Sequence, residues 1–319
     1  MKHRRQFIKM IGLTIGTSFF ADKIFAIPSS HYYIKKPLRI GFITDLHHLQ
    51  FGQSEDMRMK IFMDEVVKTS PDFIIQCGDF CRPKGSENIM KEWNRFNGPK
   101  YHVLGNHDMD VCNKETIMKL WGMEKRYYSF DQNGFHFVII DRNFLKQDDG
   151  NLVDYNTDNF GPAPSPKRNF SDKEQLEWLK QDLESAKYPV IVFMHQPVFI
   201  TDFYNEIGNA DEILQIFDDA NFNATKNGSG KVAAVFMGHD HDDRYGERNG
   251  VHYFIINSST YVYADGQPFY FEEPLYAFIN LDPKGTLSIE GKNTKYKNAP
   301  DSIAAKFPTK ISDHHLKIS

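Results

Sequence analysis

The sequence predicts an α/β domain, because short apolar runs alternate with segments of helical periodicity. Five runs rich in Ile, Val and Phe are too short for helices and indicate buried strands: 38–44, 72–77, 101–104, 189–194 and 231–237. Two later stretches, 127–141 and 250–290, are typical of antiparallel strands and hairpins.

Helices are expected between the buried strands. Apolar side chains recur at helical spacing over 57–66. Ser171 and Glu174 form a capping box ahead of Leu-rich helical spacing over 176–183. Asn209 can cap a further helix that carries apolar residues over 213–217.

Composition narrows the class of protein. Hydrophobic residues make up 40% of the 319 residues and charged residues 25%, as in globular proteins. No apolar run reaches the ~20 residues that span a bilayer, so no stable membrane span is expected. The net charge of −4 provides no basic excess for a nucleic-acid backbone, and no nucleic-acid partner is expected.

The chain begins with a basic region that precedes an apolar stretch over 10–21. This pattern predicts an export signal over residues 1–26, and Arg4-Arg5-Gln6-Phe7-Ile8-Lys9 resembles the twin-arginine consensus. We therefore expect the twin-arginine export machinery as a partner and a periplasmic or other extracytoplasmic location. An uncleaved anchor or a frayed basic helix is the alternative. The α/β domain is expected over 27–290, and 291–319 is expected to form a polar surface tail.

The three cysteines cannot form a disulfide framework, and their spacing is not that of a zinc finger. Cys77 is expected in a buried strand. A disulfide between Cys81 and Cys112 after export is left open.

Each predicted buried strand ends in polar residues that can bind a metal ion. The five segments are Asp45-Leu46-His47, Gly78-Asp79, Gly105-Asn106-His107-Asp108, His195 and Gly238-His239-Asp240-His241. Ligands collect at the carboxyl ends of strands in open α/β sheets, so these segments should converge. Asp45 and His47 are two residues apart, and so are His239 and His241. In an extended segment, this spacing points both side chains to one side. Five of the 13 histidines lie here, which indicates a metal site.

This ordered set of motifs resembles the calcineurin-like metallophosphoesterases, and the resemblance spans residues 38 to about 285. It implies an α/β/β/α sandwich of four layers, with two mixed β-sheets and a dinuclear site at the carboxyl ends of the strands. It further implies three sets of metal ligands: Asp45, His47 and His241 for one ion, Asn106, His195 and His239 for the other, and Asp79 as the bridge. His107 would be a catalytic residue that does not bind metal, oriented by Asp108.

Two divalent ions, with Mn, Fe or Zn favoured by the mixed nitrogen and oxygen ligands, would make this site cationic and suited to a phosphate ester. We expect hydrolysis by a metal-bridging hydroxide, with His107 assisting the leaving group. The expected substrate is a phosphodiester or phosphomonoester of a small nucleotide or phosphoalcohol. A nuclease of the same chemistry and a non-catalytic metal-binding interaction protein are the alternatives.

Three features near these motifs have two interpretations each. Arg82 occupies the position of the tyrosine ligand of purple acid phosphatases, and could contact a phosphate or form a surface salt bridge. The long segment 142–170, with Tyr155 and Phe160, is either a functional cover over the substrate or a surface excursion. The aromatic residues over 253–278 indicate either sheet packing or a stacking platform for a base.

Overall fold

The computed structural model describes residues 36–52, 54–156, 167–202 and 207–318. The predicted export signal over 1–26 and Phe160 lie outside these residues. In the described part of the chain, no helix is both long and apolar enough to cross a membrane.

Two mixed sheets of six strands form the centre of the domain. The first sheet contains, in spatial order, β16 (His314–Lys317), β15 (Thr286–Gly291), β14 (Ala277–Asp282), β1 (Leu38–Ile43), β2 (Phe73–Cys77) and β3 (Lys100–Val103). Strands β1, β2 and β3 are parallel, whereas β14, β15 and β16 pair antiparallel. The predicted strands over 38–44, 72–77 and 101–104 are therefore confirmed.

The second sheet contains β10 (Arg244–Arg248), β11 (Val251–Ile255), β9 (Val232–Met237), β8 (Val190–Met194), β5 (Phe135–Ile140) and β4 (Tyr128–Gln132). The hairpin predicted over 127–141 is formed by β4 and β5. The later stretch is antiparallel with one exception, because β11 pairs parallel with β9. Buried strands in parallel pairs explain why 189–194 and 231–237 are continuous apolar runs.

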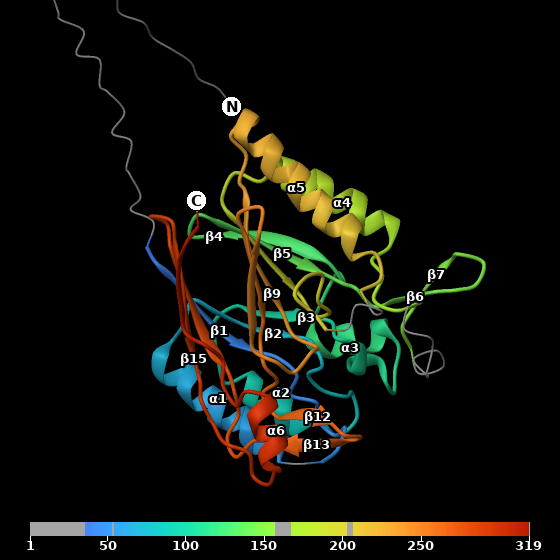
Figure 1. Ribbon diagram of the computed structural model, residues 1–319, viewed down its shortest axis with the longest axis vertical. Helices are drawn as coiled ribbons and strands as arrows, with labels where there is room; N and C mark the ends of the chain where they lie inside the picture. Colours follow the sequence, from blue (N-terminus) through green and yellow to red (C-terminus); the bar gives the residue numbers. More distant parts are fainter. Residues whose placement is uncertain (1–35, 53, 157–166, 203–206, 319) are drawn as a thin grey trace, which may run out of the picture. The chain divides into compact units, whose positions relative to one another are not determined.

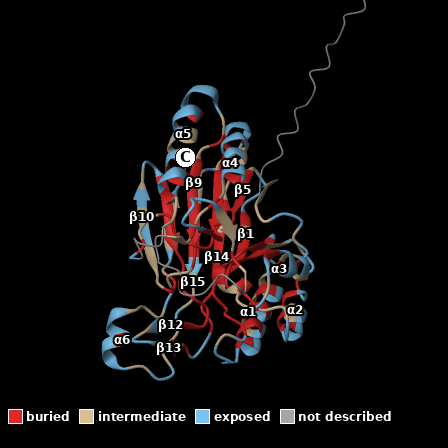
Figure 2. Ribbon diagram, turned by 90° about the vertical axis from the view of Figure 1, so that its right-hand side faces the viewer, coloured by how far each residue is buried: buried red, intermediate tan, exposed pale blue. Residues whose placement is uncertain are grey.

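Helices cover the outer face of each sheet, which makes four layers (Figure 1). On the first sheet lie α1 (Glu55–Thr69), α2 (Glu87–Trp93) and α3 (Lys114–Trp121), and on the second lie α4 (Lys173–Ser185) and α5 (Ala210–Asn227). Three apolar cores separate the layers, and the central one joins Phe42 and Phe73 of the first sheet to Phe193 of the second. Figure 2 shows the buried strands between exposed helix surfaces. The predicted α/β/β/α sandwich is confirmed.

The helix starts differ in detail from the predicted caps. Asp172, not Ser171, is the N-cap of α4, and its carboxylate accepts a hydrogen bond from Gln175 N at 3.1 Å. Ser171 donates to Asp141 O instead. Asn209 precedes α5, but its side chain bonds the backbone of Ser171 and thereby ties the starts of α4 and α5 together.

The prediction of a surface tail over 291–319 is wrong. This segment includes the short helix α6 (Asp301–Lys306), and β16 adds an edge strand to the first sheet. Ile303, Ile311 and Ile318 are buried. Widely spaced apolar residues, which a low mean hydropathy conceals, anchor the segment to the domain.

The burial of Tyr155 decides between the two interpretations of this residue. Tyr155 follows the hairpin of β6 (Phe144–Lys146) and β7 (Leu152–Asp154), is fully buried, and bonds Asn169 through its hydroxyl. It cannot cover a substrate.

The three cysteines have free thiols, so Cys81 and Cys112 form no disulfide.

Candidate metal centre

The predicted ligands converge beyond the carboxyl ends of strands in both sheets, as the α/β topology requires. Their backbone is not extended, however. Thirteen described residues other than glycine have positive φ, and five of them are predicted metal ligands: Asp45, His47, Asp79, His239 and His241. Such strained conformations concentrate at functional sites. The pairs spaced by two therefore enter the site through left-handed turns rather than through strand alternation.

Asp45, His47 and His241 form the first group of converging atoms. Asp45 Oδ1 lies 3.2 Å from Nε2 of His241 and 3.6 Å from Nε2 of His47, and the two nitrogens are 2.8 Å apart. All three side chains are buried. One carboxylate and two imidazoles thus face a common point.

Asp79, His195 and His239 form the second group. His195 Nδ1 donates to Cys77 O at 2.8 Å, which orients Nε2 toward Asp79 Oδ2 at 3.1 Å. The same Asp79 oxygen lies 3.7 Å from His47 Nε2 of the first group. Asp79 therefore stands between the two groups, where the predicted bridging ligand would be.

Asn106 follows β3 at the start of the short 3₁₀ helix η1 (Asn106–Met109). Its side-chain oxygen is buried and accepts no hydrogen bond. The N–H of the next residue, His107, donates to Asp79 Oδ1 at 2.7 Å, which holds this turn against the second group. A buried oxygen without a donor is suited to bind a cation.

Glycines permit the close approach of these loops. A Cβ on Gly78, whose φ is +95°, would lie 2.4 Å from Nδ1 of His195. A Cβ on Gly238 would lie 2.5 Å from Asp45 Oδ2. The glycines that precede the metal motifs in the sequence therefore make room for the ligand side chains themselves.

The chemistry of the two groups fits divalent cations. Burial opposes ionisation of Asp45 and Asp79, but the His195 charge and the neighbouring histidines outweigh it and hold both pKa values below the usual range. Burial lowers the pKa of His47 to about 4 and that of His239 to about 3, which favours the neutral imidazole that binds metals. The ring nitrogens of His47 and His241 that face Asp45 are both Nε2, so one nitrogen of each ring is directed at the common point. Anionic carboxylates beside the neutral imidazoles of His47 and His239 form a donor set for such ions.

His107 lies within reach of both groups, since one of its ring nitrogens clusters with donor atoms of His47 and Asp79. Its Nδ1 is 3.0 Å from Asp110 Oδ1, and Arg82 Nη2 donates to the other oxygen of Asp110 at 2.9 Å. Burial lowers the pKa of His107, but the charges of Asp79 and Asp110 outweigh this effect and the net shift is upward.

The prediction that Asp108 orients His107 is wrong. The Asp108 carboxylate points the other way and accepts the backbone N–H groups of Gly105, Asp79 and Phe80 at 2.7–3.1 Å. It stabilises the loops, whereas Asp110 contacts the imidazole. Side chains three residues apart eclipse in a 3₁₀ turn and adjacent ones do not, so this spacing was a usable signal.

Gln50, which the sequence analysis did not single out, and Tyr261, one of the aromatic residues over 253–278, complete the surroundings of His107. Gln50 Nε2 lies 3.2 Å from His107 Nδ1, and the Tyr261 hydroxyl donates to Gln50 Oε1 at 3.1 Å. Tyr261 also packs on His47 and His241, with ring centroids 5.0 and 4.8 Å apart. Of the two interpretations of Arg82, the salt bridge is the one present.

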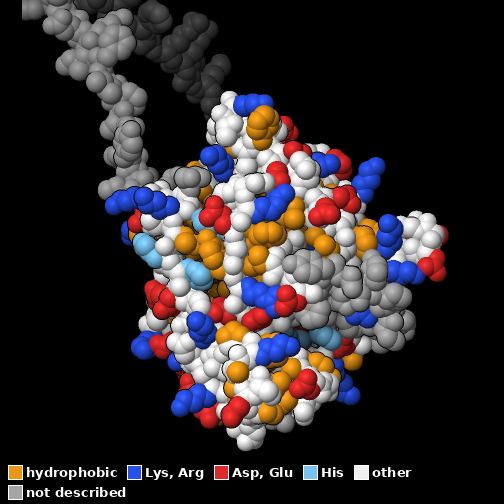
Figure 3. All heavy atoms as spheres, in the orientation of Figure 1, with side chains coloured by type: hydrophobic (Ala, Val, Ile, Leu, Met, Phe, Trp, Pro, Cys, Tyr) orange, Lys and Arg blue, Asp and Glu red, His pale blue; other side chains and the backbone are white. Residues whose placement is uncertain are grey.

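The two groups open into a cleft of about 380 Å³. Its lining joins metal-site side chains to three aromatic rings, and consists of His47, Gln50, Phe51, Asp79, His107, His239, Asp240, His241, Tyr261 and Tyr263. Figure 3 shows Lys and Arg interspersed with Asp and Glu on the face that it draws, without a continuous basic stripe.

Comparison with known proteins supports the same chemistry. The profile of the calcineurin-like phosphoesterase family matches residues 38–243. A manganese-dependent ADP-ribose/CDP-alcohol diphosphatase of Arabidopsis thaliana is 28% identical over 229 residues, which cover 59% of this chain and 70% of that protein. A 3′,5′-cyclic-nucleotide phosphodiesterase of Nostoc sp. is 22% identical over 291 residues, which cover 84% and 95%.

Solved structures share the fold at low identity. A dimetal phosphatase from Danio rerio superposes with a TM-score of 0.64 at 14% identity, covering 88% of this chain and 99% of its own. GAP50, described as the anchor in the inner membrane complex of Plasmodium, has a TM-score of 0.55 at 18% identity and 89% coverage of both chains. The family profile spans more than half of this chain and includes all seven predicted metal ligands. The chain therefore belongs to the calcineurin-like phosphoesterase family and is a metal-dependent phosphoric ester hydrolase.

Proposed function

We propose that this protein uses two divalent metal ions to hydrolyse phosphodiester or diphosphate bonds of small nucleotides. Manganese is one candidate for these ions. Asp45, His47 and His241 would hold one ion, and Asn106, His195 and His239 the other, with Asp79 between them. The observation that carries this proposal is the pair of converging donor groups, joined by one Asp79 oxygen and opening into one cleft.

The two curated relatives support this substrate class through their names. One is named for ADP-ribose and CDP-alcohols and the other for 3′,5′-cyclic nucleotides. Each of these compounds combines a nucleoside with a phosphodiester or diphosphate group. The first relative is also named as manganese-dependent, in agreement with a nitrogen and oxygen donor set.

The size of the cleft favours small substrates over a nucleic acid. A volume of about 380 Å³ lies in the range of small-molecule sites, ~300–1,000 Å³. The chain's net charge of −4 provides no electrostatic attraction for a long phosphate backbone. The nuclease alternative has neither feature in its favour.

The chain's own residues would divide the work as follows. Bound divalent ions would supply Lewis-acid activation of the phosphoryl group and of a water. His107, close to Asp79, would give a proton to the departing oxygen. Asp110 would hold the imidazole through Nδ1 and stabilise its charged form, and Arg82 would hold Asp110.

A panel of phosphate esters tests this proposal. With added Mn²⁺, the purified protein should hydrolyse phosphodiesters or diphosphates of nucleosides faster than it hydrolyses nucleoside monophosphates or duplex DNA. Removal of metal by a chelator should abolish turnover, and Mn²⁺ should restore it. Preferential cleavage of DNA would contradict the proposal in favour of a nuclease.

We also propose export through the twin-arginine route, supported by the motif Arg4-Arg5-Gln6-Phe7-Ile8-Lys9. Replacement of Arg4 and Arg5 by Lys should retain the protein in the cytoplasm. Unchanged recovery outside the cytoplasm would overturn this route.

A further inference from the structure

Two exposed aromatic rings lie at the mouth of the metal cleft. Of eight large apolar side chains that are exposed in the described part of the chain, Phe51 and Tyr263 line this cleft, with 42% and 53% of their surface accessible. Their ring centroids are 6.1 Å apart and their planes differ by 16°. A clustered exposed apolar surface marks a binding site more often than single scattered residues do.

The two rings are connected directly to the metal centre. Tyr261, which packs on His47 and His241, lies 5.3 Å from Phe51 in an edge-to-face contact. Tyr261 itself is only 3% exposed, so it packs against Phe51 and offers little surface of its own to a ligand. The accessible surface of Phe51 and Tyr263, called here the aromatic wall, therefore lies in the same cleft as the metal ligands.

Hydrogen bonds to the segment Asp45-Leu46-His47 hold the Tyr263 side of the wall in place. Tyr263 belongs to the hairpin of β12 (Tyr261–Ala264) and β13 (Gln267–Tyr270). Just before it, Ser258 Oγ donates to Asp45 O and Thr260 Oγ1 donates to Leu46 O, both at 2.9 Å. The segment that carries Tyr263 is therefore fixed to the segment that carries the ligand Asp45.

The buried guanidinium of Arg58, on α1, secures both ends of the same hairpin by donating to Ser259 O and Phe271 O. The turn Asp265-Gly266 has positive φ at both residues, as a tight two-residue hairpin requires. These contacts orient the wall before any substrate binds, which reduces the entropy lost on binding.

The chemistry of the two side chains limits what they can recognise. Phe51 has no polar atom, and the Tyr263 hydroxyl already donates to Gly266 O at 2.9 Å. Both residues therefore offer a ring face and little else. A near-parallel pair suits a planar ring, whereas a quaternary ammonium is held by several rings that surround it.

From this arrangement, we infer that Phe51 and Tyr263 form a base-stacking subsite, which binds the nucleobase of a nucleotide whose phosphate lies at the metal centre. This inference rests on the proposed function and makes it more specific. Because every base has a π face, the subsite selects nucleotides over simple alkyl phosphates without selecting one base. Of the two sequence interpretations of the aromatic residues over 253–278, the stacking platform then applies to Tyr263 and sheet packing to its buried neighbours.

A pair of substrates with one leaving group isolates the base. The first is thymidine 5′-(4-nitrophenyl) phosphate, and the second is its abasic counterpart, which has a hydrogen in place of the base. Wild-type protein should show a higher kcat/KM for the first, mainly through KM. In the Phe51→Ala/Tyr263→Ala variant, the ratio of the two kcat/KM values should fall ~10-fold to 100-fold.

Further variants separate stacking from other roles. Phe51→Leu keeps an apolar side chain but should lower the ratio, whereas Tyr263→Phe should preserve it because the hydroxyl faces the turn. Phe222→Ala removes an exposed ring on α5 and serves as the matched control, with an unchanged ratio. Thermal unfolding of each variant checks that the domain is intact.

The outcomes distinguish this inference from the proposed function. If wild-type protein with Mn²⁺ hydrolyses neither ester, the proposed function is wrong. If it hydrolyses both with equal kcat/KM, or if the double variant keeps the wild-type ratio, the subsite is wrong and the hydrolase remains. A loss confined to the 4-nitrophenyl ester of phosphocholine would replace base stacking by recognition of a cation.

Discussion

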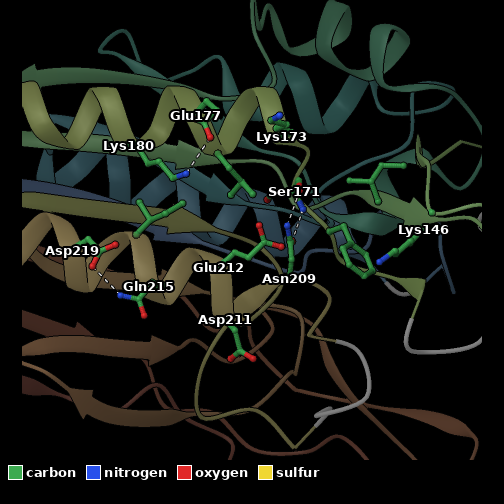
Figure 4. A pocket seen from close by; sticks show the side chains of 15 residues that line it. Lys146, Ser171, Lys173, Glu177, Lys180, Asn209, Asp211, Glu212, Gln215 and Asp219 are labelled. Carbon is green, nitrogen blue, oxygen red and sulfur yellow. Dashed lines mark hydrogen bonds and ion pairs between the residues drawn. The ribbon is translucent and has the colours of Figure 1, made fainter.

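The metal cleft and the groove between α4 and α5 are two hollows of very different character. The groove is the larger, at about 690 Å³ against 380 Å³. Two pairs of its polar side chains bond each other: Lys180 pairs with Glu177 along α4, and Gln215 donates to Asp219 along α5 (Figure 4). None of its described lining side chains has a buried polar atom without a hydrogen-bond partner. Among its lining residues only Gly150 has positive φ.

The smaller cleft has the opposite properties. The buried side-chain oxygen of Asn106 has no hydrogen-bond partner, and most of the predicted ligands lie on strained backbone. Unsatisfied buried polar atoms and strain both cost stability, so they persist where a ligand compensates for them. The comparison teaches that donor atoms and strain, not cavity size, locate the chemistry in this molecule.

The largest expected effect follows from Asp79, whose Oδ2 faces a histidine of each donor group. Asp79→Asn keeps the shape of the side chain but removes the charge shared by both groups. We expect kcat/KM to fall by about 10³-fold or more, together with loss of bound metal in elemental analysis. Two metals per chain and wild-type turnover in this variant would contradict the dinuclear assignment.

The next effect separates proton transfer from metal binding inside the cleft. His107→Ala should leave the metal content nearly unchanged, because His107 is not among the proposed ligands. Esters with alkoxide leaving groups should be slowed ~10²-fold to 10⁴-fold, and nitrophenyl esters much less, since nitrophenolate departs without a proton. Equal loss on both kinds of ester would instead mean that His107 positions the phosphoryl group.

A smaller effect is expected at Asp110, and it tests the corrected orientation of His107. Asp110→Asn retains an oxygen near Nδ1 but removes the negative charge, so alkoxide esters should be slowed ~10-fold without a change in metal content. Rates on nitrophenyl esters should change little.

Asp108→Asn is the matched comparison. Asp108 accepts three backbone N–H groups, so this change should lower the midpoint of thermal unfolding and affect both kinds of ester equally. If Asp108→Asn slowed alkoxide esters more than nitrophenyl esters and Asp110→Asn did not, Asp108 would be the residue that orients His107, as expected from the sequence.

The strand-end motifs could be predicted from the sequence because each is local. An apolar run identifies a buried strand, and polar residues at its end lie where parallel strands place their ligands. The spacing of Asp45 and His47 did not reveal their positive φ, since the turn depends on contacts with loops distant in the sequence. For example, the backbone N–H groups of these two residues donate to Gly78 O and Asp79 O.

The parts that sequence reasoning missed depend on tertiary contacts. β16 contains two adjacent histidines and one leucine, so its alternation is too weak to indicate a strand without the edge of β15. The aromatic wall joins Phe51 to Tyr263 across more than 200 residues of sequence. Composition could indicate that aromatic residues were abundant, but not which of them would remain exposed beside the metals.

The smallest expected effect lies in the groove, and it completes the comparison. Lys180 and Glu177 are about half exposed on α4, and their ion pair is 3.1 Å long. Because water and salt screen such pairs, Lys180→Ala should change the free energy of unfolding by no more than ~0.5 kcal/mol. Its kcat/KM on nucleotide esters should match wild type, since the groove lies over the outer face of the second sheet. Chemical denaturation and steady-state kinetics on one preparation measure both quantities. A several-fold loss of activity with stability unchanged would show that the larger hollow takes part in catalysis, and the contrast between the two hollows would no longer hold.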